Sequence, residues 1–268
     1  MKHKPKVKRG MDEGFDPRFG TRDTAPDAGT GSPSLGSKRR WTPHDIAQVR
    51  PSTPRQAEAL QAWFQGDHVG LLGSVGTGKS FIASYLALRS LTEGEVERIV
   101  IVRSAVQSRD QGFLPGTDVE KMAPFEVPYR GLFAELCPLR PNSYDDMKRE
   151  GLVEFVSTSF LRGITIDHAV VILEEAQNLD FAEINTVMTR AGQGTRILIT
   201  GDTLQNDLAR DRRGTSGLAL MRRVAKRVPS IALVDFTRDD IVRSAFVKQW
   251  VIAVEDLDAD DTKEALAA

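Results

Sequence analysis

The sequence predicts an α/β fold in which a mostly parallel β-sheet is flanked by helices. Short apolar runs alternate with longer segments of helical periodicity between Trp41 and Val254, a pattern typical of such sheets. Each run is compact and apolar, as expected for a strand buried on both faces. The 268 residues are 40% apolar and 27% charged, which suffices for the core of one large domain or two small ones and excludes gross disorder.

Five segments have the character of strands, and three have helical spacing. The expected strands are residues 69–72, 99–102, 170–173, 197–200 and 231–234. The expected helices are residues 80–91, 181–190 and 216–225, whose apolar positions indicate one buried face each. The segment 104–146 contains several Pro and Gly residues, so we expect an irregular insertion or an inserted subdomain there.

The two ends of the chain differ in composition from the middle. Residues 1–40 carry ten Lys and Arg against five Asp and Glu and are rich in Gly, Pro, Ser and Thr, which predicts a disordered basic tail. Such an arm would either be solvated or touch nucleic acid. Residues 255–268 carry six acids and one Lys, which predicts an acidic flexible tail. The expected folded domain is therefore 41–254.

Cysteine and histidine usage limits the metal chemistry of the chain. Cys137 is the only cysteine and the four histidines lack ligand spacing, so we expect neither a disulfide framework nor a zinc site. The first residues are basic with no apolar segment behind them, and no window approaches about 18 consecutive apolar residues. We therefore expect no signal peptide, no membrane partner and a cytoplasmic location.

A glycine-rich segment follows the first expected strand and precedes the first expected helix. It reads Gly73, Ser74, Val75, Gly76, Thr77, Gly78, Lys79 and Ser80, which is the Walker A spacing in the strand, loop and helix context that it requires. Backbone N–H groups of such a loop converge on phosphates at a helix N-terminus. We expect Lys79 to reach the β- and γ-phosphates of ATP and Ser80 to hold Mg²⁺. An ordinary glycine-rich turn is the alternative, but it would not require Lys-Ser after the last glycine.

Two adjacent carboxylates follow the expected strand 170–173. Mg²⁺ prefers hard oxygen ligands, and an attacking water needs a base or an orienting group. Because neighbouring residues on a strand point to opposite faces, we expect Glu174 to lie near Mg²⁺ and Glu175 to face the water. The alternative is a pair of solvated acids at the end of a strand.

Polar residues also follow the expected strand 197–200. Thr200 or Asp202, together with Gln205, would be placed to sense the γ-phosphate and to relay its loss. A Gly-Asp pair commonly makes an ordinary turn, which is the alternative.

The order of these motifs resembles the PhoH-like P-loop ATPases from about Thr53 to Val254. The matching segments are Ser-Val-Gly-Thr-Gly-Lys-Ser (74–80), Gly-Phe-Leu-Pro-Gly (112–116), Glu-Lys (120–121), Leu-Arg-Gly (161–163), Glu-Glu-Ala-Gln-Asn (174–178), Thr-Gly-Asp-Thr-Leu-Gln-Asn-Asp-Leu (200–208), Ser-Gly-Leu (216–218) and Asp-Ile-Val-Arg (240–243). The resemblance implies a RecA-like P-loop NTPase core similar to superfamily 1 helicases. It also implies Mg²⁺-dependent ATP hydrolysis, a homo-oligomeric ring, often of six subunits, and a role with RNA or single-stranded nucleic acid.

The resemblance further assigns residues to roles. Gln56 matches the family glutamine that reads adenine, although it would also fit a surface helix position. Arg243 is the favoured arginine finger, with Arg103 and Arg162 as the other candidates. For each of the three, the alternative is an ordinary ion pair with a neighbouring acid. Ser104 and Ser244 replace the family proline and histidine beside two of these arginines.

Glu174 is the main departure, because the family has aspartate at this position. One methylene adds about 1.5 Å of reach, and a misplacement near 1 Å costs about 10²-fold in a positioned reaction. We expect binding to survive and turnover to be reduced.

The lead interpretation is an ATPase that acts with RNA as an oligomer, with Glu175, Lys79, Arg243 and Gln205 as catalytic residues. The main alternative is a nucleotide-switched RNA-binding or assembly module with negligible hydrolysis. A small-molecule kinase is not favoured, because the sequence shows no arginine-rich lid. A GTPase is not favoured either, because no Asn-Lys-x-Asp motif follows the Walker elements. The near-neutral core argues against strong sequence-independent binding of duplex DNA.

Overall fold

The computed structural model of the protein describes residues 40–104, 118–203 and 217–267. Within these residues, six parallel strands form one sheet in the order β3-β2-β4-β5-β1-β6. The strands are β1 (His68–Gly73), β2 (Arg98–Arg103), β3 (Val153–Ser157), β4 (Ala169–Leu173), β5 (Arg196–Gly201) and β6 (Ile231–Phe236). The helices are α1 (Pro54–Gln65), α2 (Lys79–Glu93), α3 (Asp118–Leu136), α4 (Ser143–Arg149), α5 (Phe181–Met188), α6 (Gly217–Ala225) and α7 (Ala245–Ala267). Among the described residues, four short 3₁₀ turns accompany them: η2 (Pro43–Asp45), η3 (Thr158–Leu161), η4 (Ala176–Asn178) and η5 (Arg238–Asp240).

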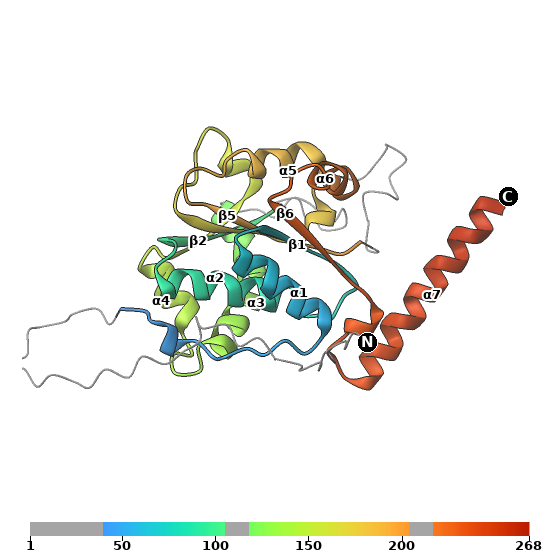
Figure 1. Ribbon diagram of the computed structural model, residues 1–268, viewed down its shortest axis with the longest axis horizontal. Coiled ribbons are helices and arrows are strands. Elements are labelled where there is room, and N and C mark those ends of the chain that lie inside the picture. The colour runs from blue at the N-terminus through green and yellow to red at the C-terminus, as the bar shows by residue number, and fades with distance from the viewer. Residues whose placement is uncertain (1–39, 105–117, 204–216, 268) are drawn as a thin grey trace, which may run out of the picture. The chain divides into compact units, whose positions relative to one another are not determined.

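The sheet separates two apolar cores. Helices α1, α2 and α3 cover one face, and α5 and α6 cover the other (Figure 1). Side chains such as Trp63, Leu86 and Phe133 build the first core, while Leu179 and Met221 contribute to the second. Residues of β4 are buried without exception, which explains why its sequence is apolar throughout rather than alternating.

The predicted fold class is confirmed. All five expected strands lie within β1, β2, β4, β5 and β6, and the expected helices correspond to α2, α5 and α6. The sequence interpretation missed β3. This strand pairs with β2 alone, and as an edge strand it carries the exposed Glu154 within its apolar run. It therefore lacks the continuous apolar signal of the central strands.

The expectation of an irregular segment over 104–146 is wrong for the residues that the structure describes there. Helices α3 and α4 occupy most of 118–146, and α3 contains Pro124 and Pro128. Each proline removes one helical N–H group, which is why the composition predicted a break. The helix nevertheless buries Phe133 and Leu136 completely in the core, and this packing outweighs the local preference.

Helix α7 crosses the predicted domain boundary at residue 254 and continues to Ala267. This segment contains neither Gly nor Pro and is rich in Ala, so its helix propensity is high despite its acidic charge. Arg238 forms ion pairs with Glu255 (3.2 Å) and Asp256 (2.8 Å) and ties the helix to η5. The predicted basic tail, up to residue 39, lies outside the described residues.

The topology brings three strand ends together at one edge of the sheet. Strand β5 lies between β1 and β4, so the carboxyl ends of all three strands adjoin. Ligands of open α/β sheets bind at this edge. Within the described ranges, none of the helices combines the length and the apolar composition that crossing a membrane requires.

Candidate nucleotide site

The loop between β1 and α2 has the backbone geometry that its glycines predict. Gly73, Gly76 and Gly78 all adopt positive φ angles, of 122°, 78° and 84°. A Cβ atom on Gly73 would lie 1.9 Å from the carbonyl oxygen of Phe236 in β6, so only glycine fits there. The Thr77 hydroxyl donates to the Ser74 carbonyl (2.9 Å) and closes the loop.

Lys79 is the first residue of α2, and its side chain contacts the backbone of this loop. Its Nζ donates to the carbonyl oxygens of Gly73 (2.7 Å) and Ser74 (2.6 Å). Burial lowers the pKa of Lys79, while Asp202, Glu175 and Glu174 oppose that shift electrostatically. An anionic phosphate would therefore meet a positive charge that is largely removed from water.

Ser80 and Glu174, the two residues expected to hold Mg²⁺, lie within hydrogen-bond distance of each other. The Ser80 hydroxyl donates to Glu174 Oε2 across 3.3 Å, and Glu174 is only 4% exposed. Burial is the main cause that raises the pKa of Glu174, whereas the nearby Tyr129, Thr200 and Ser80 hydroxyls lower it. No hydrogen bond reaches Glu174 Oε1 from the residues that the structure describes. This buried, unsatisfied oxygen beside Ser80 fits a Mg²⁺ ion and its waters.

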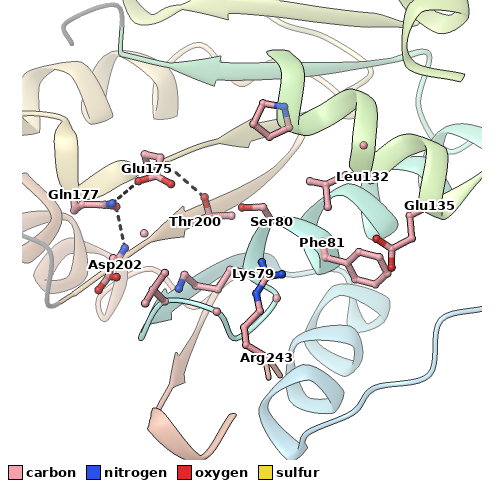
Figure 2. A pocket seen from close by; sticks show the side chains of 16 residues that line it. Lys79, Ser80, Phe81, Leu132, Glu135, Glu175, Gln177, Thr200, Asp202 and Arg243 are labelled. Carbon is pink, nitrogen blue, oxygen red and sulfur yellow. Dashed lines mark hydrogen bonds between the residues drawn. The ribbon is translucent and has the colours of Figure 1, made fainter. Parts of the chain in front are cut away.

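The catalytic candidate Glu175 is held by a separate hydrogen-bond chain. Gln177 Nε2 donates to Glu175 Oε2 (2.6 Å), and Gln177 Oε1 accepts from the backbone N–H of Asp202 (2.9 Å; Figure 2). The Glu175 N–H also points to the Thr200 hydroxyl (3.4 Å). Glu174 and Glu175 thus have different hydrogen-bond partners. The reason differs from strand alternation, because β4 ends at Leu173 and Glu175 is left-handed, with φ at 53°.

Lys79, Ser80 and Glu175 line one pocket of about 560 Å³, whereas Glu174 is not among its lining residues. The glycine-rich loop and the start of α2 contribute Val75, Gly76, Gly78, Lys79 and Ser80 to its lining. The segments after β4, at the end of β5 and after β6 contribute Glu175, Gln177, Thr200, Gly201, Asp202 and Arg243. A volume of this size is usual for small-molecule sites. Gly73, Ser74 and Thr77 belong to the loop but do not line the pocket, and the Thr77 to Ser74 hydrogen bond is internal to the loop.

Of the three candidate arginines, only Arg243 lines this pocket. The neighbouring Val242 N–H donates to the Gly76 carbonyl (3.0 Å), so the segment after β6 is attached directly to the loop. Arg103 instead stacks over the ring of Phe125, 4.3 Å from its centre, and Arg162 is exposed elsewhere.

Gln56 lies behind the loop and does not line the pocket. Its Nε2 donates to the Thr77 carbonyl (3.0 Å), and its Oε1 accepts from the Ser52 N–H (2.7 Å). The side chain is 4% exposed, so both amide groups are already used within the chain. Adenine recognition by Gln56 stays a prediction. Gln205 lies outside the described residues.

The sequence interpretation missed two sets of pocket residues. Gln177 was part of a quoted motif, but nothing in the sequence showed that its amide bridges β4 and β5. The other set comes from α2 and α3 and comprises Phe81, Pro128, Gly131, Leu132 and Glu135. Because 104–146 was read as irregular, no periodicity argument could place α3 beside the pocket.

Fold and site together show an α/β P-loop fold, with a glycine-rich loop after β1 and an acidic strand end on β4. The chain belongs to the PhoH-like protein family, whose family model matches residues 48–255. It is 34% identical over 208 residues to a PhoH-like protein of Synechocystis sp., a match that covers 77% of this chain and 62% of the relative. It is 33% identical over 210 residues to protein PhoH of Escherichia coli K12, covering 78% and 59% of the two chains.

The chain thus spans about three fifths of the length of these curated relatives. Among solved structures, it is similar to the large terminase of a thermophilic bacteriophage in complex with ADP, with a TM-score of 0.46 and 12% identity over 74% of this chain and 48% of that chain. It is also similar to a Sulfolobus solfataricus SWI2/SNF2 ATPase core in complex with dsDNA, with a TM-score of 0.38 and 13% identity, covering 72% and 46%.

Proposed function

We propose that the protein hydrolyses ATP with Mg²⁺ and couples this reaction to RNA or single-stranded nucleic acid as an oligomer. The observation that carries the ATPase proposal is a pocket lined by Lys79, Ser80 and Glu175, in which Ser80 also donates a hydrogen bond to the buried Glu174. The family resemblance supports the nucleic-acid partner and a ring, with six subunits favoured. A single RecA-like core offers one lobe, so a neighbouring subunit would supply the second surface that grips a strand.

In the proposed complex, the loop N–H groups and Lys79 bind the β- and γ-phosphates. Ser80 and Glu174 would hold Mg²⁺, which supplies charge neutralisation on these phosphates. The described residues contain no cluster of three or more His, Cys, Asp or Glu side chains suited to a metal. A single hydroxyl and a single carboxylate suit Mg²⁺ that shares its remaining positions between phosphate oxygens and water.

Glu175 would orient the attacking water and accept its proton. The water oxygen forms a bond to the γ-phosphorus while the bond from that phosphorus to the β–γ bridging oxygen breaks, giving ADP and phosphate. Gln177 holds Glu175 Oε2, which leaves Oε1 for the water. Arg243 would offset the charge that develops on the γ-phosphate.

Phosphate release at steady state tests this proposal. We expect Glu175→Gln to lower the rate by about 10²–10⁴-fold while ATP still binds, because proton acceptance is lost and the phosphate contacts remain. Lys79→Ala should remove ATP binding. If the wild-type protein, with RNA present, releases no more phosphate than Glu175→Gln, the protein is not an ATPase.

Glu174 supports one rival function. Its side chain is longer than the family aspartate, so the carboxylate would be misplaced and hydrolysis would be slow. In this second function, ATP binding would switch the conformation of an RNA-binding or assembly module, with negligible hydrolysis. Glu174→Asp separates the two functions. Turnover that rises in this variant would favour a slowed ATPase, whereas nucleotide-dependent RNA binding without turnover in either protein would favour the switch.

A further inference from the structure

Two buried side chains beside the candidate Mg²⁺ site each have a polar atom without a hydrogen-bond partner among the described residues. They are Glu174, through Oε1, and Tyr129 of α3, through its hydroxyl group, and each residue is 4% exposed. Helix α3 passes beside the pocket, which its residues Pro128, Gly131 and Leu132 help to line (Figure 2). A buried donor or acceptor without a partner is unfavourable and uncommon. An unpaired donor next to an unpaired acceptor therefore needs an explanation.

The two side chains influence each other electrostatically. Burial is the main cause that raises the pKa of Glu174, and among the hydroxyls that lower it Tyr129 acts more strongly than Thr200 or Ser80. Burial also raises the pKa of Tyr129, and Glu174 adds to that shift. The groups are thus near enough to interact, although the Tyr129 hydroxyl forms no hydrogen bond in this structure.

Packing fixes the tyrosine more firmly than it fixes the glutamate. The Tyr129 ring packs against the rings of Phe155 and Tyr144, with 5.6 Å and 6.4 Å between the ring centroids. Glu174 has three rotatable side-chain bonds, and its carboxylate is held by Ser80 at Oε2 (3.3 Å). The hydroxyl is therefore a fixed donor beside an acceptor that can turn toward it.

We propose that Tyr129 is a positioning residue of the Mg²⁺ site: its hydroxyl donates to Glu174 Oε1 when Mg²⁺ and nucleotide bind, and so holds the carboxylate beside Ser80. The inference rests on the proposed function and adds α3 to the metal site. Carboxylates that ligate a metal usually accept a further hydrogen bond from a neighbouring group, which orients them. Each carboxylate oxygen has two lone pairs, so Oε1 can accept from Tyr129 and still face the ion or its waters.

The length of Glu174 explains why such a donor matters in this chain. Compared with the family aspartate, the additional methylene adds about 1.5 Å of reach and one more bond to immobilise. Ordering this bond costs conformational entropy, and a hydrogen bond from a group that is already fixed offsets that cost. In Glu174→Asp the carboxylate is withdrawn from Tyr129, so the hydroxyl should matter only when residue 174 is glutamate.

Calorimetric titration with a non-hydrolysable ATP analogue tests the proposal without turnover. The measured quantity is the Mg²⁺ gain, which is the ratio of the affinity in Mg²⁺ to the affinity in EDTA. We expect Tyr129→Phe to lower the Mg²⁺ gain about tenfold, because the metal ligand loses its orienting hydrogen bond. In the Glu174→Asp background, Tyr129→Phe should change the gain by less than about twofold.

Tyr144→Phe is the matched control. Its ring belongs to the same aromatic cluster, but its hydroxyl donates to Glu126 (3.1 Å). The Mg²⁺ gain should therefore stay as in the wild-type protein, while the loss of a formed hydrogen bond should lower Tm.

Thermal unfolding in EDTA separates positioning from a purely structural role. Tyr129→Phe keeps the ring contacts and removes a hydroxyl that has no partner in the described chain, so Tm should stay equal or rise. A lower Tm together with an unchanged Mg²⁺ gain would assign the hydroxyl to stability alone and overturn the proposal.

Two further results would also overturn the positioning role. One is an equal fall of the Mg²⁺ gain in Tyr144→Phe or in the Glu174→Asp background, and the other is a wild-type protein that binds the analogue with no gain from Mg²⁺. Both leave nucleotide binding itself intact. A wild-type protein that does not bind the analogue in either condition would instead refute the proposed function.

Discussion

At the scale of single residues, Glu174 shows how a reactive site opposes stability. Its carboxylate is 4% exposed, yet its Oε1 atom has no hydrogen-bond donor among the described residues. Burying a partly satisfied charged group is unfavourable. The fold tolerates this because Ser80 offers one hydrogen bond and the surrounding core is extensive.

We expect Glu174→Gln to stabilise the nucleotide-free protein in the presence of a chelator, because it removes a buried charge while keeping the shape of the side chain. A gain of about 1 kcal/mol corresponds to about 2–4 °C in a domain of this size. Thermal unfolding at neutral pH measures the gain.

The direction of the pKa shift of Glu174 determines how the stability of the protein depends on pH. Because burial raises the pKa of Glu174, the folded state binds a proton at pH values where the unfolded state has lost it. The wild-type protein therefore loses stability as pH rises through this window, and the advantage of Glu174→Gln should shrink as pH falls. An advantage that stays constant, or that grows on acidification, would contradict this account.

At the scale of elements, the site depends on the coupling of β4 to β5. Gln177 belongs to neither strand, but its buried amide connects Glu175 after β4 with the Asp202 N–H after β5. The 3₁₀ turn η4 places this amide, starting from the left-handed Glu175. Two hydrogen bonds, of 2.6 Å and 2.9 Å, thereby connect the end of β5 to the catalytic candidate.

We expect Gln177→Ala to lower kcat by about 10-fold or more with little change in KM for ATP, since it releases Glu175 without altering the phosphate loop. Asn178→Ala is the matched control from the same turn, because its side chain contacts neither Glu175 nor Asp202 through any described hydrogen bond. Equal losses in the two variants would indicate general disruption of the turn rather than positioning of Glu175.

At the scale of the whole molecule, the pocket joins distant parts of the chain, so ligand binding should stabilise the fold. Residues from the loop after β1, from α2, α3 and β5, and from the segment after β6 line the same cavity. A ligand at 100 times its Kd adds about 2.7 kcal/mol, or about 5–10 °C.

Thermal unfolding with Mg²⁺ and ADP measures this effect. We expect a clear rise in Tm for the wild-type protein and none for Lys79→Ala, which removes the ammonium group that we propose binds the phosphates in this pocket. A rise of the same size in Lys79→Ala would show that ADP binds elsewhere.

Sequence patterns alone determined much of this molecule. Buried central strands are apolar throughout, so five of them were visible, and the phosphate loop was visible because its glycines, lysine and serine occupy consecutive positions. The acidic pair could also be predicted, because Glu174 and Glu175 directly follow the apolar run of β4 in the sequence and must therefore lie at the end of that strand.

Tertiary structure decided the rest. Helix α3 forms against its local proline signal because Phe133 and Leu136 find a core to enter, and β3 is an edge strand whose pattern one charge interrupts. The two buried glutamines have contacts that the sequence did not reveal: Gln56 supports the phosphate loop, and Gln177 reaches the catalytic candidate. Local patterns report the periodicity of burial, whereas the partners of a polar side chain depend on which strand ends and helices meet in space.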